Sequence, residues 1–305
     1  MINWLIISIA SYLFFAIASL GDKMVLKKTP KPKLYTFYVS FLSIFAVLAL
    51  PLIHFNFPNT QTLIWASLDA IVYVWGLYTL FLALEKFDVS RTIPTIGAIQ
   101  PILVFVLALF FWPSATLTLS FANIIAFLLL LVGGVMISME KNINLTKDSL
   151  LLSFLTALLF SLDFIFQKFV FGGTDLISGF ILMRLLGVIV CLVFLLDKEV
   201  RRDIFKKEGE KTGLVFIIAQ GAGGLATVFQ SWAIKIVPVA YLAIINALKG
   251  IQYVFLFIMT VLFSWFIPKL LKESLSKKVL IQKLIAIFII AIGLFVLIQY
   301  GNFIY

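Results

Sequence analysis

The chain is poor in the residue types on which most enzyme chemistry depends. Its 305 residues include one cysteine and one histidine, and only 12% of them are charged. Cys191 has no second cysteine to pair with, and His54 alone provides neither a zinc motif nor paired-histidine chemistry. The sequence also contains no glycine-rich phosphate-binding motif. We therefore expect neither an enzyme nor an ATP-driven pump, and neither a cofactor nor a metal ion.

Apolar residues are what the chain has in abundance. They make up 63% of the sequence, and the mean hydropathy is +1.14. Apolar stretches of about 18 or more residues recur along the whole length, and each can cross about 30 Å of hydrocarbon. The pattern predicts an all-α, multi-pass protein of a cell membrane, of the bacterial or archaeal plasma-membrane type, in contact with lipid on its outer surface.

Loop residues such as proline and glycine divide these stretches into ten predicted transmembrane helices. The predicted spans are 3–26, 34–55, 62–84, 89–111, 119–139, 149–171, 175–196, 213–236, 237–266 and 280–300.

Most of the 24 basic residues lie after odd-numbered spans. Lys168 and Lys235 are exceptions at the other face, and Arg184 and Lys249 lie inside spans. Basic residues in short loops mark the cytoplasmic side, so we expect the odd loops in the cytoplasm and both termini outside. The net charge of +10 is thereby explained by topology, and we expect no nucleic-acid partner.

The two halves of the sequence are related by a nearly constant offset. The first and sixth spans align Ser8 with Ser153, Phe15 with Phe160, Lys23 with Lys168 and Val25 with Val170; the third-to-fourth and eighth-to-ninth spans align Lys86 with Lys235, Ala98 with Ala247 and Gln100 with Lys249. Because five is odd, two such repeats cross the membrane in opposite senses. We expect one membrane domain of two inverted five-helix repeats, residues 1–147 and 148–305, with a substrate site between them.

Several segments resemble the EamA-like family of the drug/metabolite transporter superfamily. They are Ala83-Leu84-Glu85-Lys86-Phe87-Asp88-Val89-Ser90 running on to Gln100-Pro101-Ile102, Gly133-Gly134-Val135, Ala233-Ile234-Lys235-Ile236-Val237-Pro238-Val239-Ala240, Glu273 and Gly293. The resemblance implies a ten-helix fold whose central cavity is lined by helices 1, 3, 4, 6, 8 and 9. It also implies transport of small metabolites such as amino acids or nucleotide sugars.

Ionisable side chains inside the spans are the strongest candidates for function, because each costs about 2.5–3.5 kcal/mol at membrane depth. Asp163 and Lys249 are expected to face the cavity, where Asp163 could hold a proton or an ammonium group and Lys249 a carboxylate. Arg184 is expected to be a structural partner of an acid, and Asp22 with Lys23 an interfacial pair or a gate.

Polar residues at helical spacing complete the predicted site. Thr156, Asp163 and Gln167 share one helical face. On the eighth span, small residues that include Gly223 and Gly224 indicate either close helix packing or room for substrate. The predicted substrate-binding residues are Asp163, Lys249, Gln167, Thr156, Asp69, Tyr73, Gln100, Gln220, Thr227, Tyr241 and Gln252.

Three functions are compatible with this pattern. The first is a secondary transporter, an exporter or exchanger of a small polar organic metabolite, with a proton as a candidate coupling ion and a monomer or homodimer as the functional unit. The second is a lipid-carrier flippase, which requires a lateral opening between helices. The third is an intramembrane enzyme, which requires clustered catalytic carboxylates or a nucleophile–base pair.

Overall fold

The computed structural model describes residues 3–26, 31–52, 55–87, 89–138, 146–204, 210–266 and 277–300, and every regular element in these ranges is helical. The first half contains α1 (Asn3–Leu26), α2 (Pro32–Phe41), the 3-10 helix η1 (Leu42–Leu52), α3 (Thr60–Lys86), α4 (Val89–Phe111), α5 (Pro113–Thr116) and α6 (Phe121–Ser138). The second half contains α7 (Lys147–Gly173), α8 (Leu176–Cys191), η2 (Leu192–Leu196), α9 (Lys198–Asp203), α10 (Glu210–Ile236), η3 (Val239–Tyr241), α11 (Leu242–Ala247), α12 (Lys249–Phe266) and α13 (Lys277–Tyr300). His54, Asp88 and Glu273, which the sequence analysis named, lie outside the described residues, as does the side chain of Lys23.

Eight helices within the described ranges are long and apolar enough to cross a membrane. The chain is therefore an all-α membrane protein. Two of the ten predicted spans are not among the eight. Span 34–55 is divided between α2 and η1, and within span 89–111 the apolar helix is the shorter segment Thr95–Phe111.

Polar caps define where several helices begin. Asn59 Oδ1 accepts a hydrogen bond from the backbone N–H of Thr62, and Thr146 Oγ1 accepts one from Ser149, so both satisfy amide groups at a helix start. Asp175 caps α8 in the same way. Partial burial alone would raise the pKa of the Asp175 carboxyl, but its hydrogen bonds outweigh this effect and hold that pKa below its ordinary value.

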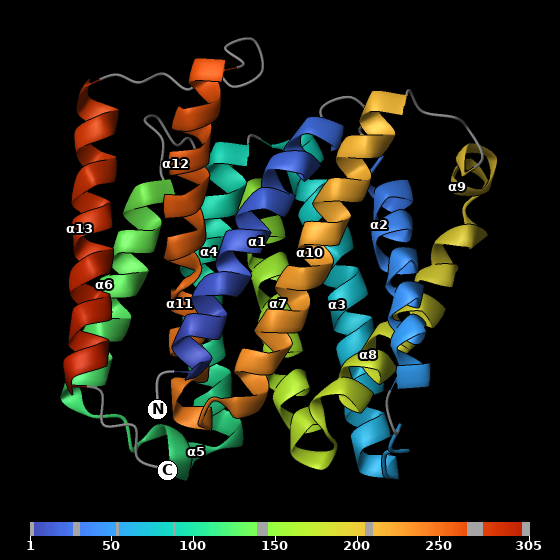
Figure 1. Ribbon diagram of the computed structural model, residues 1–305, viewed down its shortest axis with the longest axis horizontal. Coiled ribbons are helices and arrows are strands. Elements are labelled where there is room, and N and C mark those ends of the chain that lie inside the picture. Colours follow the sequence, from blue (N-terminus) through green and yellow to red (C-terminus); the bar gives the residue numbers. More distant parts are fainter. Residues whose placement is uncertain are drawn as a thin grey trace.

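The long helices pack as an upright bundle (Figure 1). α1 lies along α10, α3 lies along α7, and α6 lies along α13 at one edge. The first turn of α1 and the last turn of α13 lie at the same end of the bundle, the lower end in Figure 1. The helices that begin there, including α1 and α3, end at the upper end.

Glycines permit the close contact of α6 with its neighbours. A Cβ atom added at Gly250 would lie 2.9 Å from the Cα atom of Gly134, and one added at Gly133 would lie 2.6 Å from a side-chain carbon of Ile290. Small residues are the usual means by which membrane helices approach closely, because no hydrophobic driving force acts between helices in lipid. α6, α12 and α13 therefore form a tightly packed unit.

Aromatic residues fill the lower end of the bundle. The Phe169 ring stacks on those of Trp65 and Trp112, each at a centroid distance of 4.3 Å, and Phe111 meets Phe169 edge-on at 5.4 Å. Such contacts each contribute about 0.5–1.5 kcal/mol beyond the burial of area. They join α3, α4 and α7 into a closed floor.

Two lysines reinforce this floor by capping the last turns of α7 and α10 reciprocally. Lys168 Nζ donates to the carbonyls of Ile234 and Val237, and Lys235 Nζ donates to those of Phe171 and Thr174. The final carbonyls of a helix lack partners within the helix, and a cation there also complements the helix dipole. These two basic residues, which deviate from the predicted charge pattern, therefore have a structural role.

Candidate functional site

A cavity of about 1560 Å³ lies inside the bundle, above the aromatic floor. Its wall includes residues from α1, α3, α4, α7, α10, α11 and α12, which cover the six spans expected to line it. The wall is wider than the six helices that the resemblance implies, since Val39 of α2, Arg184 of α8 and Lys283 of α13 also contribute. Polar and charged side chains from both halves of the sequence meet in this space.

The cavity reaches the surface at the upper end of the bundle. Its lining includes Glu85 and Lys86 at the end of α3, both exposed, and Asp22 near the end of α1. The opposite end is closed by the floor described above. The cavity is therefore open on one side of the bundle, the side at which α1 and α3 end.

Lys249 lies in the cavity wall at the start of α12. Its Nζ donates a hydrogen bond of 3.1 Å to Oε1 of Gln100 on α4. Gln100 is the residue that the predicted sequence repeat aligns with Lys249, so two positions aligned by that prediction contact each other. The acceptor is a neutral amide, so this bond does not balance a positive charge on Lys249, and no ion pair joins Lys249 to an acid within the described residues.

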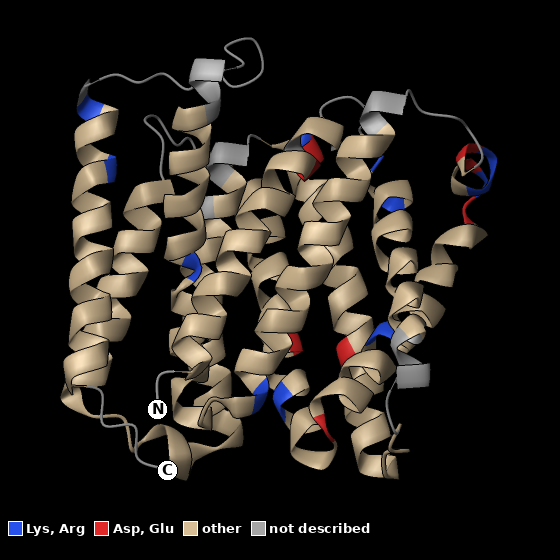
Figure 2. Ribbon diagram, in the orientation of Figure 1, with Lys and Arg blue, Asp and Glu red and all other residues tan. Residues whose placement is uncertain are grey.

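Asp163 of α7 lies in the same wall but has different partners. The Asp69 carboxyl of α3, the Gln167 side chain and the charge of Arg184 lie close enough to act on its carboxyl group electrostatically. Gln167 in turn accepts a hydrogen bond of 3.2 Å from Ser231. Figure 2 shows that a small number of charged residues lie along the middle of the helices rather than near their ends.

Arg184 connects α8 to this group. Its guanidinium carbon lies 4.2 Å from the centroid of the Tyr73 ring and 5.2 Å from that of Phe180. Cations over aromatic faces are attracted by the ring quadrupole, most strongly where water is absent. Asp69 and Asp163 act on Arg184 electrostatically but form no ion pair with it, so its partnership with an acid stays a prediction; Arg184 also lines the cavity.

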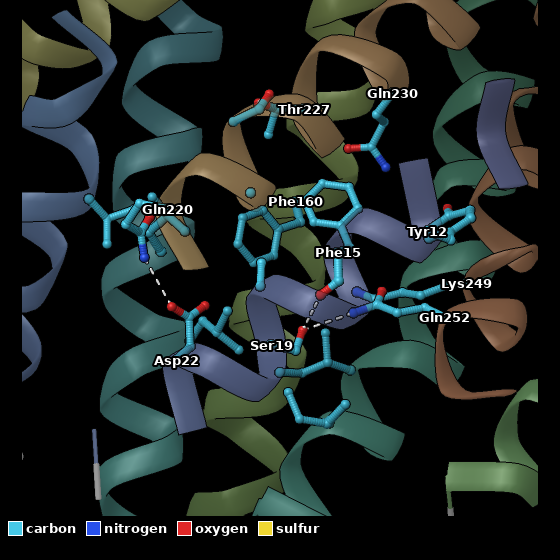
Figure 3. Close-up of a pocket in the computed structure, with 18 of the residues that line it drawn as sticks. Tyr12, Phe15, Ser19, Asp22, Phe160, Gln220, Thr227, Gln230, Lys249 and Gln252 are labelled. Atoms are coloured by element: carbon cyan, nitrogen blue, oxygen red, sulfur yellow. Dashed lines mark hydrogen bonds between the residues drawn. The ribbon is translucent and has the colours of Figure 1, made fainter. Parts of the chain in front are cut away.

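A second cluster of polar side chains surrounds Asp22 at the open end of the cavity. Its Oδ1 accepts hydrogen bonds of 2.5 Å from Tyr35 Oη and 3.0 Å from Gln220 Nε2, so α1, α2 and α10 are joined there. In Figure 3, Gln220 and Asp22 lie on one side of the Phe15 and Phe160 rings, while Lys249 and Gln252 lie on the other. Gln252 donates a hydrogen bond of 3.0 Å to Ser19 Oγ.

The small residues of α10 have two roles, because some allow close helix packing and others leave room in the cavity. A Cβ atom added at Gly223 would lie 3.6 Å from that of Ala18, which is ordinary helix contact. At Gly221 and Gly224, which line the cavity, an added Cβ would meet no atom within 4 Å. These two glycines therefore widen the cavity.

The structure places eight of the predicted site residues in the cavity wall and three outside it. Those in the wall are Asp163, Lys249, Gln167, Tyr73, Gln100, Gln220, Thr227 and Gln252. Thr156 is not there, and its hydroxyl donates to the carbonyl of Leu152 within its own helix. Asp69 lies behind the wall, buried against Asp163, and Tyr241 accepts a hydrogen bond from Asn123 at 3.0 Å.

Sequence reasoning omitted several residues of the wall. Ser19, Tyr253 and Gln230 line the cavity, and Asp22 was assigned to an interface or gate rather than to the binding site. Ser19 lies one turn before Asp22 on the α1 face that meets the cavity, a helical spacing that could have indicated it. Tyr253 is placed by a tertiary contact, a hydrogen bond to the carbonyl of Ile93, which has no local signal.

Comparison with known proteins gives the fold and no activity. No family model matches the chain, and no curated protein matches its sequence. Among solved structures, 28 chains match the fold. One of them, described only as "Crystal structure of protein", superposes with a TM-score of 0.67, covering 95% of this chain and 94% of its own, at 14% sequence identity. At this identity the likeness shows a shared fold only.

Proposed function

We propose that the protein is a secondary transporter of a small polar organic metabolite, of the EamA-like type, which works by alternating access. The observation that carries this proposal is the cavity, which is large, polar in part, open at one end and closed at the other. Transporters with inverted repeats bind substrate near the middle of the membrane, between the repeats. Lys249 and Asp163 come from the second repeat and Gln100 from the first, so both repeats supply polar groups to this cavity.

Ten membrane passages are supported by segment length. α2 has 10 residues and η1 has 11. At about 1.5 Å per residue for an α-helix and about 2.0 Å for a 3-10 helix, the two together extend roughly 37 Å, which exceeds about 30 Å of hydrocarbon. α4 has 23 residues, or about 34 Å. The segment α2–η1 and the helix α4, which are not among the eight long apolar helices, are therefore each long enough to cross the membrane.

An inverted repeat is supported by which helices pack together. With ten passages, α1 and α10 are the first and eighth, while α7 and α3 are the sixth and third. Exchanging the repeats converts one pair into the other, and both pairs pack along their length. The helices α1, α2 and α10 meet at Asp22, and α7, α8 and α3 meet at Asp163. The same exchange of repeats converts the first set of helices into the second. The contact of Gln100 with Lys249 lies where the two repeats meet.

The side to which the cavity opens follows from the charge pattern. α1 and α3 end at the open side, and odd loops carry most of the basic residues. Because basic loops lie in the cytoplasm, we assign the structure to a cytoplasm-open state. The aromatic floor is then the external gate, which opens when the cavity closes on the cytoplasmic side.

The charges of the cavity favour a substrate that carries an anionic group. Lys249 presents a positive charge whose hydrogen-bond acceptor is neutral. A carboxylate or phosphate group of the substrate would compensate that charge. This choice is compatible with amino acids and nucleotide sugars and is tested by measuring the thermal stability of the purified protein with a panel of both. Stabilisation by anionic compounds that is lost in Lys249→Met supports the proposal, and no stabilisation by any of them contradicts it.

A second candidate, a lipid-carrier flippase, is supported by the lateral wall of the cavity. Phe45 of η1 and Ile217 of α10 line it, yet they are 61% and 67% exposed. A lipid tail could remain in the bilayer between η1 and α10 while its head group occupies the cavity. Stabilisation by a polyprenyl phosphate but not by the water-soluble panel would favour this candidate.

An intramembrane enzyme is less well supported, although Asp69 and Asp163 do form a carboxyl cluster that the sequence did not reveal. A catalytic carboxyl pair must present both groups to the substrate. Only Asp163 lies in the cavity wall, and Asp69 is behind it. This geometry is better suited to holding a proton than to attacking a bond.

A further inference from the structure

Three charged side chains from three helices are buried together beside the cavity. Asp69 of α3, Asp163 of α7 and Arg184 of α8 are 1%, 5% and 5% exposed. The two carboxyls lie close enough to act on each other electrostatically, and the buried Oδ1 atom of each has no hydrogen-bond partner. Nε of Arg184 likewise has none. Buried polar atoms without partners are rare and are typical of functional sites.

Two neighbouring carboxyls that are both buried require a proton. Two carboxylates at close range repel each other and lack water to solvate them, so one of the pair stays protonated. The pair then carries a single negative charge, which the guanidinium of Arg184 balances. A neutral group of this kind is far less costly at membrane depth than two carboxylates beside one cation.

The charged and titratable surroundings of the pair are few. The Tyr73 ring of α3 lies 4.2 Å from the guanidinium carbon of Arg184, and Gln167 of α7, one turn from Asp163, carries no charge. α10 also packs against α7, but its Lys235 is bound to the carbonyls of Phe171 and Thr174 in the floor. Lys168 of α7 is bound there as well.

Only one carboxyl of the pair, that of Asp163, lies at the cavity surface. Asp163 and Arg184 line the cavity, whereas Asp69 is behind them. A proton that enters from the open end therefore reaches Asp163 first and Asp69 only through it. Because α3 and α7 come from different repeats, a relative movement of the repeats would separate the two carboxyls.

We infer that Asp69 and Asp163 together form a site for one exchangeable proton, balanced by Arg184 and loaded from the cavity through Asp163. This differs from a proton carried by Asp163 alone, because neither carboxyl keeps the proton without the other. The inference identifies the proton as the coupling ion of transport, and this role rests on the proposed transport function. The proton site itself can be tested without any substrate.

The test is infrared absorption of the purified protein at neutral pH, in the region of the protonated carboxyl C=O stretch. The native protein should show this band, and transfer to D₂O should shift it, because Asp163 is in contact with the open cavity. Asp69→Asn and Asp163→Asn should each reduce the band by one carboxyl per molecule, since the remaining acid beside Arg184 ionises. Arg184→Met should increase the band by one carboxyl, because the second acid then loses its cation.

Asp175→Asn is the matched control, because it removes a carboxyl that directly precedes the apolar helix Leu176–Leu196, while asparagine keeps the helix cap. It should leave the band unchanged. If only one of the two pair variants reduces the band, the proton belongs to a single residue and the shared site is refuted. A native protein without the band, or with a band that does not shift in D₂O, overturns the inference even if every variant fails to fold. The transport proposal is unaffected by these results, because it is tested separately by substrate.

Discussion

At the scale of single residues, the decisive feature is that the two central charges of the cavity have separate partners. Lys249 donates a hydrogen bond to an amide, and Asp163 lies beside a second acid. Among the described residues, the cavity therefore presents a lysine and an acid pair at separate places instead of one ion pair. A substrate with one anionic group fits this arrangement directly.

Removing the cation should weaken binding of an anionic substrate. A hydrogen bond to a charged group contributes about 1.5–3 kcal/mol, which corresponds to roughly 10- to 100-fold in affinity. Lys249→Met should reduce the affinity of the best anionic compound of the panel by this factor, measured by titration calorimetry. Lys33→Met, which removes an exposed lysine paired with Asp197, should leave it unchanged. Equal loss in both variants would indicate a general effect of charge.

Individual residues also show where sequence reasoning stops. Asp163, Lys249, Gln100 and Gln167 could be placed in a cavity wall because polar groups inside spans avoid lipid. The contact of Asp69 with Asp163 could not, because it depends on which faces of α3 and α7 meet. Helical spacing placed Thr156 on the same face as Asp163, but a threonine hydroxyl can satisfy itself within its helix.

At the scale of helices, the α6–α12–α13 unit depends on glycine contacts and the cavity wall depends on glycine gaps. Gly134 and Gly250 meet backbone to backbone, while Gly221 and Gly224 face empty space. Sequence position alone does not separate these two uses of glycine. The start and end of most helices were predicted to within a few residues, because apolar runs and caps are local signals.

Alanine at Gly250 should destabilise the protein, because its Cβ would lie 2.9 Å from the Cα of Gly134 and the backbone must move. We expect the free energy of unfolding to fall by about 1–3 kcal/mol, the usual cost of overpacking. Gly213→Ala on α10 is the matched control, since its Cβ meets no atom within 4 Å. That variant should gain about 0.5–1 kcal/mol from the lower entropy of the unfolded chain. Reversible unfolding in mixed detergent measures both, and a stable Gly250→Ala would contradict the close crossing.

At the scale of the whole molecule, the account depends on the two ends of the bundle being different. Aromatic stacking and reciprocal lysine caps close the lower end, and the cavity opens at the upper end. The sequence predicted the all-α membrane class from apolar length alone. It could not predict which end is open, because that depends on one of several packings of the same helices.

The assigned orientation predicts the sidedness of fusions. A reporter active only in the cytoplasm should be inactive after Tyr305 and active after Asp203, because the odd loops carry the basic residues. Activity measured in whole cells at matched expression levels checks this. Strong activity after Tyr305 would reverse the assignment of the open end to the cytoplasm.

The most direct test of the central claim is uptake into proteoliposomes by the native protein and by Gly224→Leu. The leucine side chain would enter the cavity from a position where no atom lies within 4 Å of the added Cβ, so folding should be preserved. We predict uptake of an anionic metabolite by the native protein and its loss in Gly224→Leu, with unchanged thermal unfolding. Uptake that persists at the native rate in the folded variant would contradict the claim that substrate crosses the membrane through this cavity.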